Sequence, residues 1–329
     1  MKNHFKNKKI LITGGTGSFG NAFVNYIIKN KLPLKKLIIY SRDEFKQFKM
    51  AEKFPIKKFS FMRYFLGDVR DKDRLSRALG DVDIVVHAAA LKQVPLAEYN
   101  PIEYIKTNIL GAQNIIEASL DNNVEKVIAL STDKAASPIN LYGATKLCSD
   151  KLFVAANNIK GNKKIFFSVV RYGNVMGSRG SVIPLFLETK KKGFFPITDT
   201  KMTRFNISLE GAVKMVIWSI QNLKGGEILV PKIPSFKITD LAKAICMKTK
   251  LKIIGIRPGE KIHEEMISAS DSQDTYDLGR YYAIIVPNFL DRYRKNKLLK
   301  KVKNGFCYNS GTNPDFLNVS DIKRLINNI

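Results

Sequence analysis

Short apolar runs alternate with stretches of helical periodicity through the first half of the chain. The apolar runs predict strands at residues 9–13, 37–40, 61–66, 84–87, 127–130 and 165–170. Helices are predicted near residues 44–53, 71–79, 101–120 and 141–157, after a first helix whose apolar positions begin at Phe19. Strands that alternate with helices in this way predict an α/β fold, a doubly wound parallel Rossmann sheet buried on both faces.

The regular alternation loosens after Arg171, where glycine and proline interrupt it. Helices are predicted beyond this point at about residues 209–222, 238–249 and 260–267. We therefore expect a Rossmann domain with the catalytic residues over 1–180 and a smaller, mainly substrate-binding C-terminal part over 181–329. No low-complexity linker separates them, so a shared cleft is expected.

A glycine cluster stands between the first predicted strand and the first predicted helix. Its three spaced glycines follow the pattern Gly-x-x-Gly-x-x-Gly, which permits a tight turn and close approach of a pyrophosphate to the helix N-terminus. The strand before it and the helix after it favour a dinucleotide site over a simple turn. The predicted cofactor-binding residues here are Gly14, Thr16, Gly17, Ser18, Phe19 and Gly20.

The end of the second predicted strand bears on the choice of cofactor. Ser41 and Arg42 occupy the place where an acid binds the ribose of NAD, and an arginine there can accommodate the 2′-phosphate of NADP. Lys46 stands one helical turn further on as a possible helper. Asp43 argues the other way, so the residues favour NADP and leave NAD open.

Two further strand ends fit the same cleft. Asp68 and Val69 follow the third strand, where an acid can accept a hydrogen bond from an adenine amino group. Ala88 and Ala89 follow the fourth strand, where small residues let the backbone run close to a ribose. Each signal is weak when taken alone.

The fifth predicted strand leads into Ser131-Thr132-Asp133-Lys134, and the next helix carries Tyr142 and Lys146. These last two residues lie four apart, on one face of the helix. A nearby ammonium and a bound nicotinamide cation would lower the pKa of the phenol, so that Tyr142 could act as a base.

The glycine pattern together with Tyr-x-x-x-Lys resembles the extended short-chain dehydrogenase/reductase superfamily. The string from Ser131 to Lys146 resembles, more narrowly, the inverting UDP-N-acetylglucosamine 4,6-dehydratases of pseudaminic acid biosynthesis. Similarity continues through residues 90–95, 171–179 and 257–261. Retaining dehydratases carry Thr-Asp-Glu where this chain has Lys134, and simple 4-epimerases lack the Asp-Lys pair.

This resemblance implies an enzyme, a hydro-lyase acting on UDP-N-acetylglucosamine with C5 inversion and no net redox change. Lys134 would take the C5 proton, with a pKa lowered by burial and neighbouring cations, and Asp133 would protonate the departing C6 hydroxyl. Thr132 would bond the C4 oxygen, and Tyr142 is the candidate for C5 reprotonation by role. Asn108 would shape the surroundings of the tyrosine from a neighbouring helix.

A UDP-sugar carries a diphosphate, so its site needs cations and helix-end amides. By resemblance, the corresponding stretches bind the diphosphate, uracil and ribose, and Lys92 faces the sugar. The predicted substrate-binding residues are Lys92, Asn174, Arg179, Ser181, Val182, Pro184, Arg204, Arg257 and Glu260.

Composition changes this interpretation little. The chain has 329 residues and a formal net charge of +26, of which residues 61–180 hold only +4, so most of the excess is read as solvated lysine. We find no nucleic-acid-binding signature and expect no such partner, although a basic nucleic-acid-binding Rossmann protein remains the alternative from another class. Three widely spaced cysteines and no apolar stretch long enough to span a bilayer predict a cytoplasmic protein without a membrane partner.

The resemblance also suggests a homo-oligomer. Two further enzyme classes stay open, namely a 4-epimerase and a dehydratase acting on another nucleotide sugar.

Overall fold

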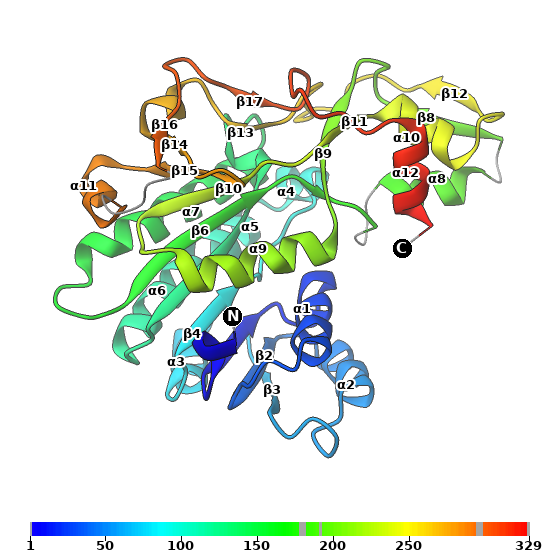
Figure 1. The fold of residues 1–329 in the computed structure, drawn as a ribbon. Coiled ribbons are helices and arrows are strands. Elements are labelled where there is room, and N and C mark those ends of the chain that lie inside the picture. The colour runs from blue at the N-terminus through cyan, green and yellow to red at the C-terminus, as the bar shows by residue number, and fades with distance from the viewer. Residues whose placement is uncertain (1, 178–181, 191–192, 294–298, 328–329) are drawn as a thin grey trace.

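A ten-stranded sheet forms the centre of the protein (Figure 1). The computed structural model describes residues 2–177, 182–190, 193–293 and 299–327. The strand order is β16-β14-β15-β10-β6-β5-β4-β1-β2-β3, and every pair from β3 to β10 is parallel. The order 3-2-1-4-5-6 within it is that of a doubly wound dinucleotide-binding fold, which confirms the predicted fold class.

The strands of the central sheet are β1 (Lys9–Thr13), β2 (Lys36–Ser41), β3 (Met62–Leu66), β4 (Ile84–His87), β5 (Lys126–Thr132), β6 (Phe166–Tyr172), β10 (Glu227–Pro231), β14 (Thr275–Asp277), β15 (Tyr281–Ile285) and β16 (Lys300–Lys301). Smaller sheets contain β7 (Asn174–Val175), β8 (Phe194–Ile197), β9 (Thr203–Ile207), β11 (Ser235–Lys237), β12 (Lys250–Ile253), β13 (Glu265–Ile267) and β17 (Tyr308–Asn309).

The α-helices are α1 (Ser18–Lys29), α2 (Glu44–Lys53), α3 (Lys72–Leu79), α4 (Val94–Tyr99), α5 (Pro101–Tyr104), α6 (Gly111–Asp121), α7 (Leu141–Ile159), α8 (Val182–Lys190), α9 (Leu209–Asn222), α10 (Ile238–Ile245), α11 (Pro287–Leu290) and α12 (Val319–Ile326). The π-helix η2 (Ile105–Leu110) joins α5 to α6, and 3-10 turns occur at η1 (Lys2–Phe5), η3 (Asp133–Ala135), η4 (Ser270–Asp274) and η5 (Asp291–Tyr293).

All six predicted strands are present, and the helices predicted at 44–53 and 209–222 have the observed bounds. The helix predicted over 101–120 is instead divided into α5, η2 and α6. The helix predicted over 260–267 is wrong. This segment is extended and ends in β13, because its backbone pairs with other segments: the Ile262 carbonyl accepts from the Thr203 amide, and the Glu264 carbonyl accepts from the Ser310 amide.

The central sheet continues past residue 180. Strand β10 adds to it in parallel beside β6, and β15 and β14 follow antiparallel. The division into functional parts at residue 180 stays a prediction, and the sheet itself crosses that point.

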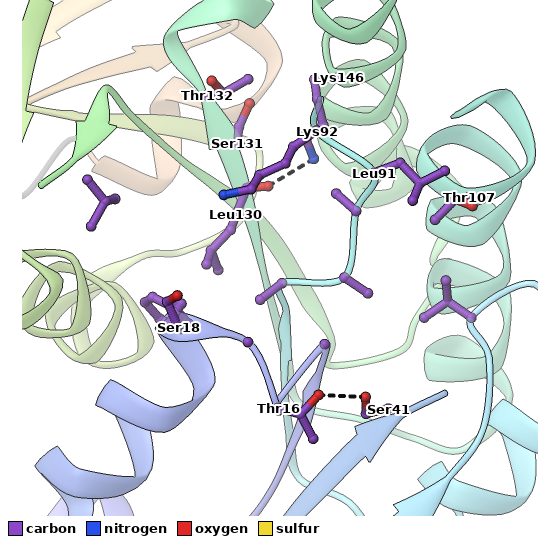
Figure 2. A pocket seen from close by; sticks show the side chains of 18 of the residues that line it. Thr16, Ser18, Ser41, Leu91, Lys92, Thr107, Leu130, Ser131, Thr132 and Lys146 are labelled. Carbon is purple, nitrogen blue, oxygen red and sulfur yellow. Dashed lines mark hydrogen bonds between the residues drawn. The ribbon is translucent and has the colours of Figure 1, made fainter. Parts of the chain in front are cut away.

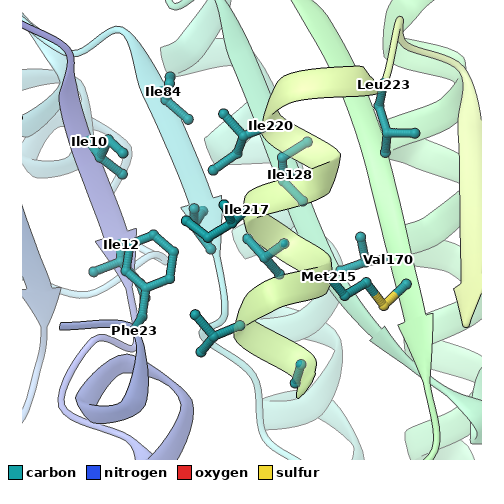
Figure 3. Packing of buried hydrophobic residues seen from close by; sticks show 14 of the residues in the cluster. Ile10, Ile12, Phe23, Ile84, Ile128, Val170, Met215, Ile217, Ile220 and Leu223 are labelled. Atoms are coloured by element: carbon teal, nitrogen blue, oxygen red, sulfur yellow. The ribbon is translucent and has the colours of Figure 1, made fainter. Parts of the chain in front are cut away.

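Helix α9 packs across one face of the sheet beside α1 (Figure 1). In Figure 3 its apolar side chains, among them Ile217 and Ile220, lie over Ile10, Ile84 and Ile128 of the parallel strands. Burial of each such side chain contributes about 1.5–3 kcal/mol to stability. Helices α3, α6 and α7 bury a second apolar cluster on the opposite face.

A third apolar cluster builds the smaller C-terminal part, at the upper right of Figure 1. It joins α8, α10 and α12 to β8 through residues such as Phe186, Phe195 and Leu241. In the described ranges, no helix combines the length and apolar character that crossing a bilayer requires.

His87 lies fully buried at the end of β4 and serves the core. Its Nδ1 is 2.9 Å from the Thr13 hydroxyl. Burial, followed by the positive charge of Lys146, lowers the pKa of His87 to about 3. The imidazole is therefore neutral in the folded protein at neutral pH.

This lowered pKa makes the stability of the fold depend on pH. The folded pKa lies below the unfolded value of about 6.5, so the stabilisation is complete above pH 6.5 and is lost as the pH falls towards 3. We expect the free energy of unfolding to fall by about 1.4 kcal/mol per pH unit below 6.5 through this residue. Urea unfolding of wild type and His87→Asn at pH 7, 6 and 5 measures how the free energy of unfolding changes with pH. This change should be smaller in the variant.

Candidate active site

A cavity of about 640 Å³ opens at the carboxyl ends of the parallel strands. Its wall contains the glycine turn after β1, the ends of β2, β4 and β5, and the first turns of α7. Figure 2 shows side chains from these elements converging on it, with Lys92 and Lys146 both extending towards Leu130. Five basic and three acidic residues line the cavity, which suits a phosphorylated ligand.

The glycine turn fits the pyrophosphate of a dinucleotide. Gly14 has φ +62°, and a Cβ there would lie 2.9 Å from the Ala89 Cα, so the turn packs directly against the loop after β4. At Gly20 a Cβ would lie 1.9 Å from the Gly15 carbonyl oxygen. Helix α1 begins at Ser18 without a side-chain cap, which leaves its first amides available to an anion.

Arg42 and Asp43 take different places at the end of β2. Asp43 is the N-cap of α2, where its carboxylate accepts from the Lys46 amide and pairs with the Lys46 ammonium. Arg42 remains half-exposed on the cavity wall, 3.6 Å from Asp68. The Ser41 and Thr16 hydroxyls lie 2.8 Å apart beside it.

Helix α7 presents Tyr142 and Lys146 to the cavity, both of them buried. Asn140 caps the helix by accepting from the Gly143 amide, and the Lys146 ammonium donates to the Leu130 carbonyl at 2.9 Å. Burial lowers the pKa of Lys146, and the nearby Asp150 opposes this only in part. Burial raises the pKa of Tyr142 to about 12, although Lys134 and a Thr132 hydrogen bond lower it. A lowered phenol pKa is therefore not a property of these residues alone.

Three charged side chains form a buried cluster beside Tyr142. Lys134 Nζ lies 3.1 Å from Asp133 Oδ1 and 3.3 Å from Glu264 Oε1. Asp133 and Glu264 are 1% and 3% exposed, and each has a second carboxylate oxygen without a hydrogen-bond partner among the described residues. Thr132 donates to Asp133 Oδ1 at 2.9 Å.

The cluster corrects one expectation and supports another. Burial alone would lower the pKa of Lys134, but Asp133 and Glu264 outweigh it and raise the pKa above its usual value. The expected lowering is therefore wrong for this arrangement, because the sequence did not reveal the second carboxylate. Burial raises the pKa of Asp133, although the positive charge of Lys134 acts to lower it. A raised pKa is what the expected role of Asp133 as a proton donor requires.

A fully buried ion pair lies beneath the site. Arg171 on β6 contacts Asp150 on α7 at 3.1 Å and donates to the Met266 carbonyl on β13. The Ser131 hydroxyl donates to the same carboxylate at 2.7 Å. This pair therefore connects the end of β5, helix α7 and strand β13, which follows Glu264.

Most of the predicted site residues line the cavity. These are Gly14, Thr16, Gly17, Ser18, Phe19, Ser41, Arg42, Lys46, Asp68, Val69, Ala88, Ala89, Lys92, Thr132, Asp133, Lys134, Tyr142, Lys146 and Asn174. Burial and the charge of Lys134 lower the pKa of Lys92, which places these two ammonium groups near each other.

Other predicted residues lie behind the wall or apart from it. Asn108 is buried, with its amide bonded to both backbone groups of Leu91 and to the Thr145 hydroxyl. Arg204 donates to the Thr203 and Ile262 carbonyls and lies 3.7 Å from Glu264. Arg257 pairs with Glu260 at 3.0 Å, on a loop whose Gly259 carbonyl accepts from Asn140.

Val182 and Pro184 belong to α8 in the smaller part, outside the cavity wall. Arg179 and Ser181 lie outside the described residues.

Glu264 is the functional candidate that the sequence analysis missed. The helix assigned to 260–267 concealed it. Had the segment been predicted as a strand, Glu264 and Met266 would have been placed on the same buried face, because side chains alternate along a strand.

The comparisons with known proteins agree with this geometry. Residues 10–286 match the family described as polysaccharide biosynthesis protein. The chain belongs to this family. It is 57% identical, over 98% of both chains, to the UDP-N-acetylglucosamine 4,6-dehydratase (inverting) of Campylobacter jejuni subsp. jejuni serotype O:2. The resemblance inferred from the motifs is thereby confirmed.

Solved structures of relatives share the fold of this family member. The X-ray structure of Pen from Bacillus thuringiensis superposes with a TM-score of 0.89 at 36% identity and covers 99% of this chain and 100% of its own. DesIV, a dTDP-glucose 4,6-dehydratase from Streptomyces venezuelae with NAD and TYD bound, gives a TM-score of 0.68 at 21% identity. That match covers 77% of this chain and 86% of DesIV.

The raised pKa of Tyr142 can be measured directly. We expect no ionisation of this phenol below about pH 11 in the cofactor-free protein, because burial disfavours the phenolate. An oxidised nicotinamide dinucleotide should lower the pKa, since its positive charge favours the phenolate. The difference in absorbance near 295 nm between wild type and Tyr142→Phe, followed against pH, reports this group alone. Ionisation below pH 9 without cofactor would contradict the burial argument.

Proposed function

We propose that the protein is an NADP-dependent UDP-N-acetylglucosamine 4,6-dehydratase that inverts the configuration at C5. The observation that carries this proposal is the buried Asp133–Lys134 pair beside Tyr142 and Lys146, in a cavity whose opposite end fits a dinucleotide. An acid and a base in contact are what the removal of water from adjacent carbons needs. The C. jejuni relative named for this reaction supports the substrate and the stereochemistry.

Tyr142 begins the reaction by removing the proton of the C4 hydroxyl. A bound NADP⁺ would supply the hydride acceptor for oxidation at C4 and the hydride donor for reduction at C6. The charge of Lys146, four residues along α7, favours the phenolate form of Tyr142. The C4 carbonyl then acidifies the proton at C5.

The Asp133–Lys134 pair can perform the elimination after one internal proton transfer. As an ion pair, Lys134 is an ammonium and Asp133 a carboxylate, and neither can do its task. Transfer of one proton along their 3.1 Å contact gives a neutral amine and a carboxylic acid. Lys134 then takes the C5 proton, and Asp133 protonates the C6 hydroxyl, which leaves as water.

The proton count closes without a proton from solvent. Tyr142 holds the proton that it took from the C4 hydroxyl and can deliver it to C5, on the face opposite Lys134. Elimination leaves Lys134 as an ammonium and Asp133 as a carboxylate, which is the ion pair from which the cycle began, so no second transfer between them is needed. The buried cluster is suited to this exchange, because low polarity brings the ionic and neutral forms of the pair closer in energy.

Product analysis tests the function. Incubation with UDP-N-acetylglucosamine and NADP⁺ should give a product lighter by one water, a 4-keto-6-deoxy sugar with inverted C5, resolved by mass spectrometry and NMR. Lys134→Met should lower product formation by about 10²–10⁴-fold, because a positioned base contributes that much. Lys214→Met is the matched control, since Lys214 is an exposed residue of α9 that pairs with Glu210.

An isomer of unchanged mass would instead indicate a 4-epimerase. Full activity and normal C5 inversion in Lys134→Met would exclude Lys134 as the base. Tight binding of NADP by that variant shows that the loss of activity does not come from unfolding.

The choice of NADP rests on the end of β2. The Asp43 carboxylate is engaged at the N-terminus of α2, and Arg42 and Lys46 are both half-exposed on the cavity wall there. We expect wild type to bind NADP more tightly than NAD. Arg42→Ala should weaken NADP binding by about tenfold, in line with the loss of a charge-assisted contact, and leave NAD nearly unchanged. Fluorescence titration with both reduced cofactors measures this ratio, and a wild-type preference for NAD would overturn it.

The wider assignments follow from the same proposal. We infer a cytoplasmic homo-oligomer that serves pseudaminic acid or surface-glycan synthesis, with UDP-sugar contacts from Lys92 and Asn174 on the cavity wall. If residues 181–329 bind the substrate, Arg204, Arg257 and Glu260 would lie close to its diphosphate and nucleoside.

A further inference from the structure

Glu264 occupies a place in the charge cluster that the reaction outlined above leaves without a task. Its carboxylate touches Lys134 at 3.3 Å and is 3% exposed, far more enclosed than a surface ion pair. It is not among the residues of the cavity wall and therefore stands behind Lys134. Since Glu264 does not face the substrate, any part that it plays must act through the lysine.

The backbone holds Glu264 firmly in this position. Its amide donates to the Ser310 hydroxyl at 2.9 Å, and its carbonyl accepts from the Ser310 amide at 2.8 Å. Lys261, three residues earlier, donates to the Ala136 carbonyl just beyond η3. The segment 261–264 is thus tied to the turn that carries Asp133 and Lys134.

The charges around Glu264 keep it ionised. Burial would raise its pKa, but Lys134, Arg204 and Lys261 outweigh this and hold the pKa below its usual value. The other titratable or charged groups near Lys134 are Asp133, Tyr142, Arg204 and Lys92. Of the two carboxyl groups in contact with Lys134, Asp133 must carry a proton for the reaction, whereas Glu264 can stay charged throughout.

The critical moment comes when Lys134 has taken the C5 proton and Asp133 has not yet released its own. At that point the ammonium is buried, and Asp133 is neutral. A buried charge without a partner is strongly unfavourable, so a second carboxylate is needed beside the lysine. We propose that Glu264 is the positioning residue that holds Lys134 and supplies the counter-charge for its ammonium while Asp133 is protonated.

This inference rests on the proposed dehydratase function and makes a separate prediction. In Glu264→Gln the proton transfer from C5 should become slower, lowering kcat by about 10–100-fold, as the loss of a buried charge partner implies. The KM for UDP-N-acetylglucosamine and the affinity for NADP should change little. Removing the negative charge also makes Lys134 easier to deprotonate, so the acidic limb of the kcat profile should move by about one pH unit or more to lower pH.

Isotope effects separate this role from a structural one. With substrate deuterated at C5, the kinetic isotope effect on kcat should rise in Glu264→Gln, because C5 deprotonation becomes more rate-limiting. With substrate deuterated at C4, the kinetic isotope effect on kcat of the same variant should fall towards unity. A variant that was merely distorted would lose activity without this redistribution.

Two further variants complete the test. Glu265→Gln is the matched control, since it makes the same substitution at the next residue, whose side chain instead accepts from the Cys307 thiol. It should behave as wild type. Glu264→Asp keeps the negative charge, so its acidic limb should stay at the wild-type position and its kcat should exceed that of Glu264→Gln.

The outcomes are distinct. Equal kcat and equal pH profiles in Glu264→Gln and wild type would overturn the role of Glu264 while leaving the dehydratase function intact. An unfolded Glu264→Gln leaves the decision to Glu264→Asp, where a shifted acidic limb despite the retained charge overturns the inference. If wild type removes no water from UDP-N-acetylglucosamine, the proposed function falls, and the role of Glu264 falls with it.

Discussion

The ion pair between Arg171 and Asp150 is the contact on which the geometry of the site depends. Both side chains are almost completely buried, and breaking such a pair by removing one partner costs about 3–5 kcal/mol. Asp150 stands two turns beyond Tyr142 on α7, on the same helix face as Lys146. Because its carboxylate is fixed against β6 and against Ser131 at the end of β5, the helix face that carries Tyr142 and Lys146 is fixed relative to the end of β5.

The same arginine joins the parallel sheet to the segment that completes the charge cluster. Its guanidinium donates to the Met266 carbonyl, two residues after Glu264, and lies 3.7 Å from Asp271. About 130 residues separate Lys134 from Glu264 in the chain. The buried cation Arg171 helps to hold the two segments together, so that the two side chains are in contact. The first half of the chain alone could not complete the cluster, because Glu264 directly precedes β13, which pairs with β17 near the C-terminus.

The two lysines of the site, Lys134 and Lys146, differ in pKa because their surroundings differ. Lys146 donates to a backbone carbonyl and has a lowered pKa, whereas Lys134 lies between two carboxylates and has a raised one. Their spacing in the sequence predicted that both would lie at the cavity, because strand ends and helix faces follow local periodicity. Their opposite pKa shifts could not be predicted, since the lowering at Lys146 comes from its burial and the rise at Lys134 depends in part on the distant Glu264. The glycine turn and Asp133 were predictable for the same local reason, and the short strands β10 and β15 were not, because their pairing is decided by distant neighbours.

The large positive charge of the chain acquires a narrower meaning in this structure. Cations that bear on the chemistry are enclosed and matched to acids, as Lys134 and Arg204 are to Glu264, and as Arg171 is to Asp150. An enzyme that removes water from adjacent carbons needs an acid that keeps its proton and a base that gives one up, side by side. In water such a pair would remain ionic, since solvation stabilises both charges. Burial reduces the free-energy difference between the ionic and the neutral form of the pair. A third charged group, Glu264, is then needed to balance the charge of the ammonium that the reaction creates.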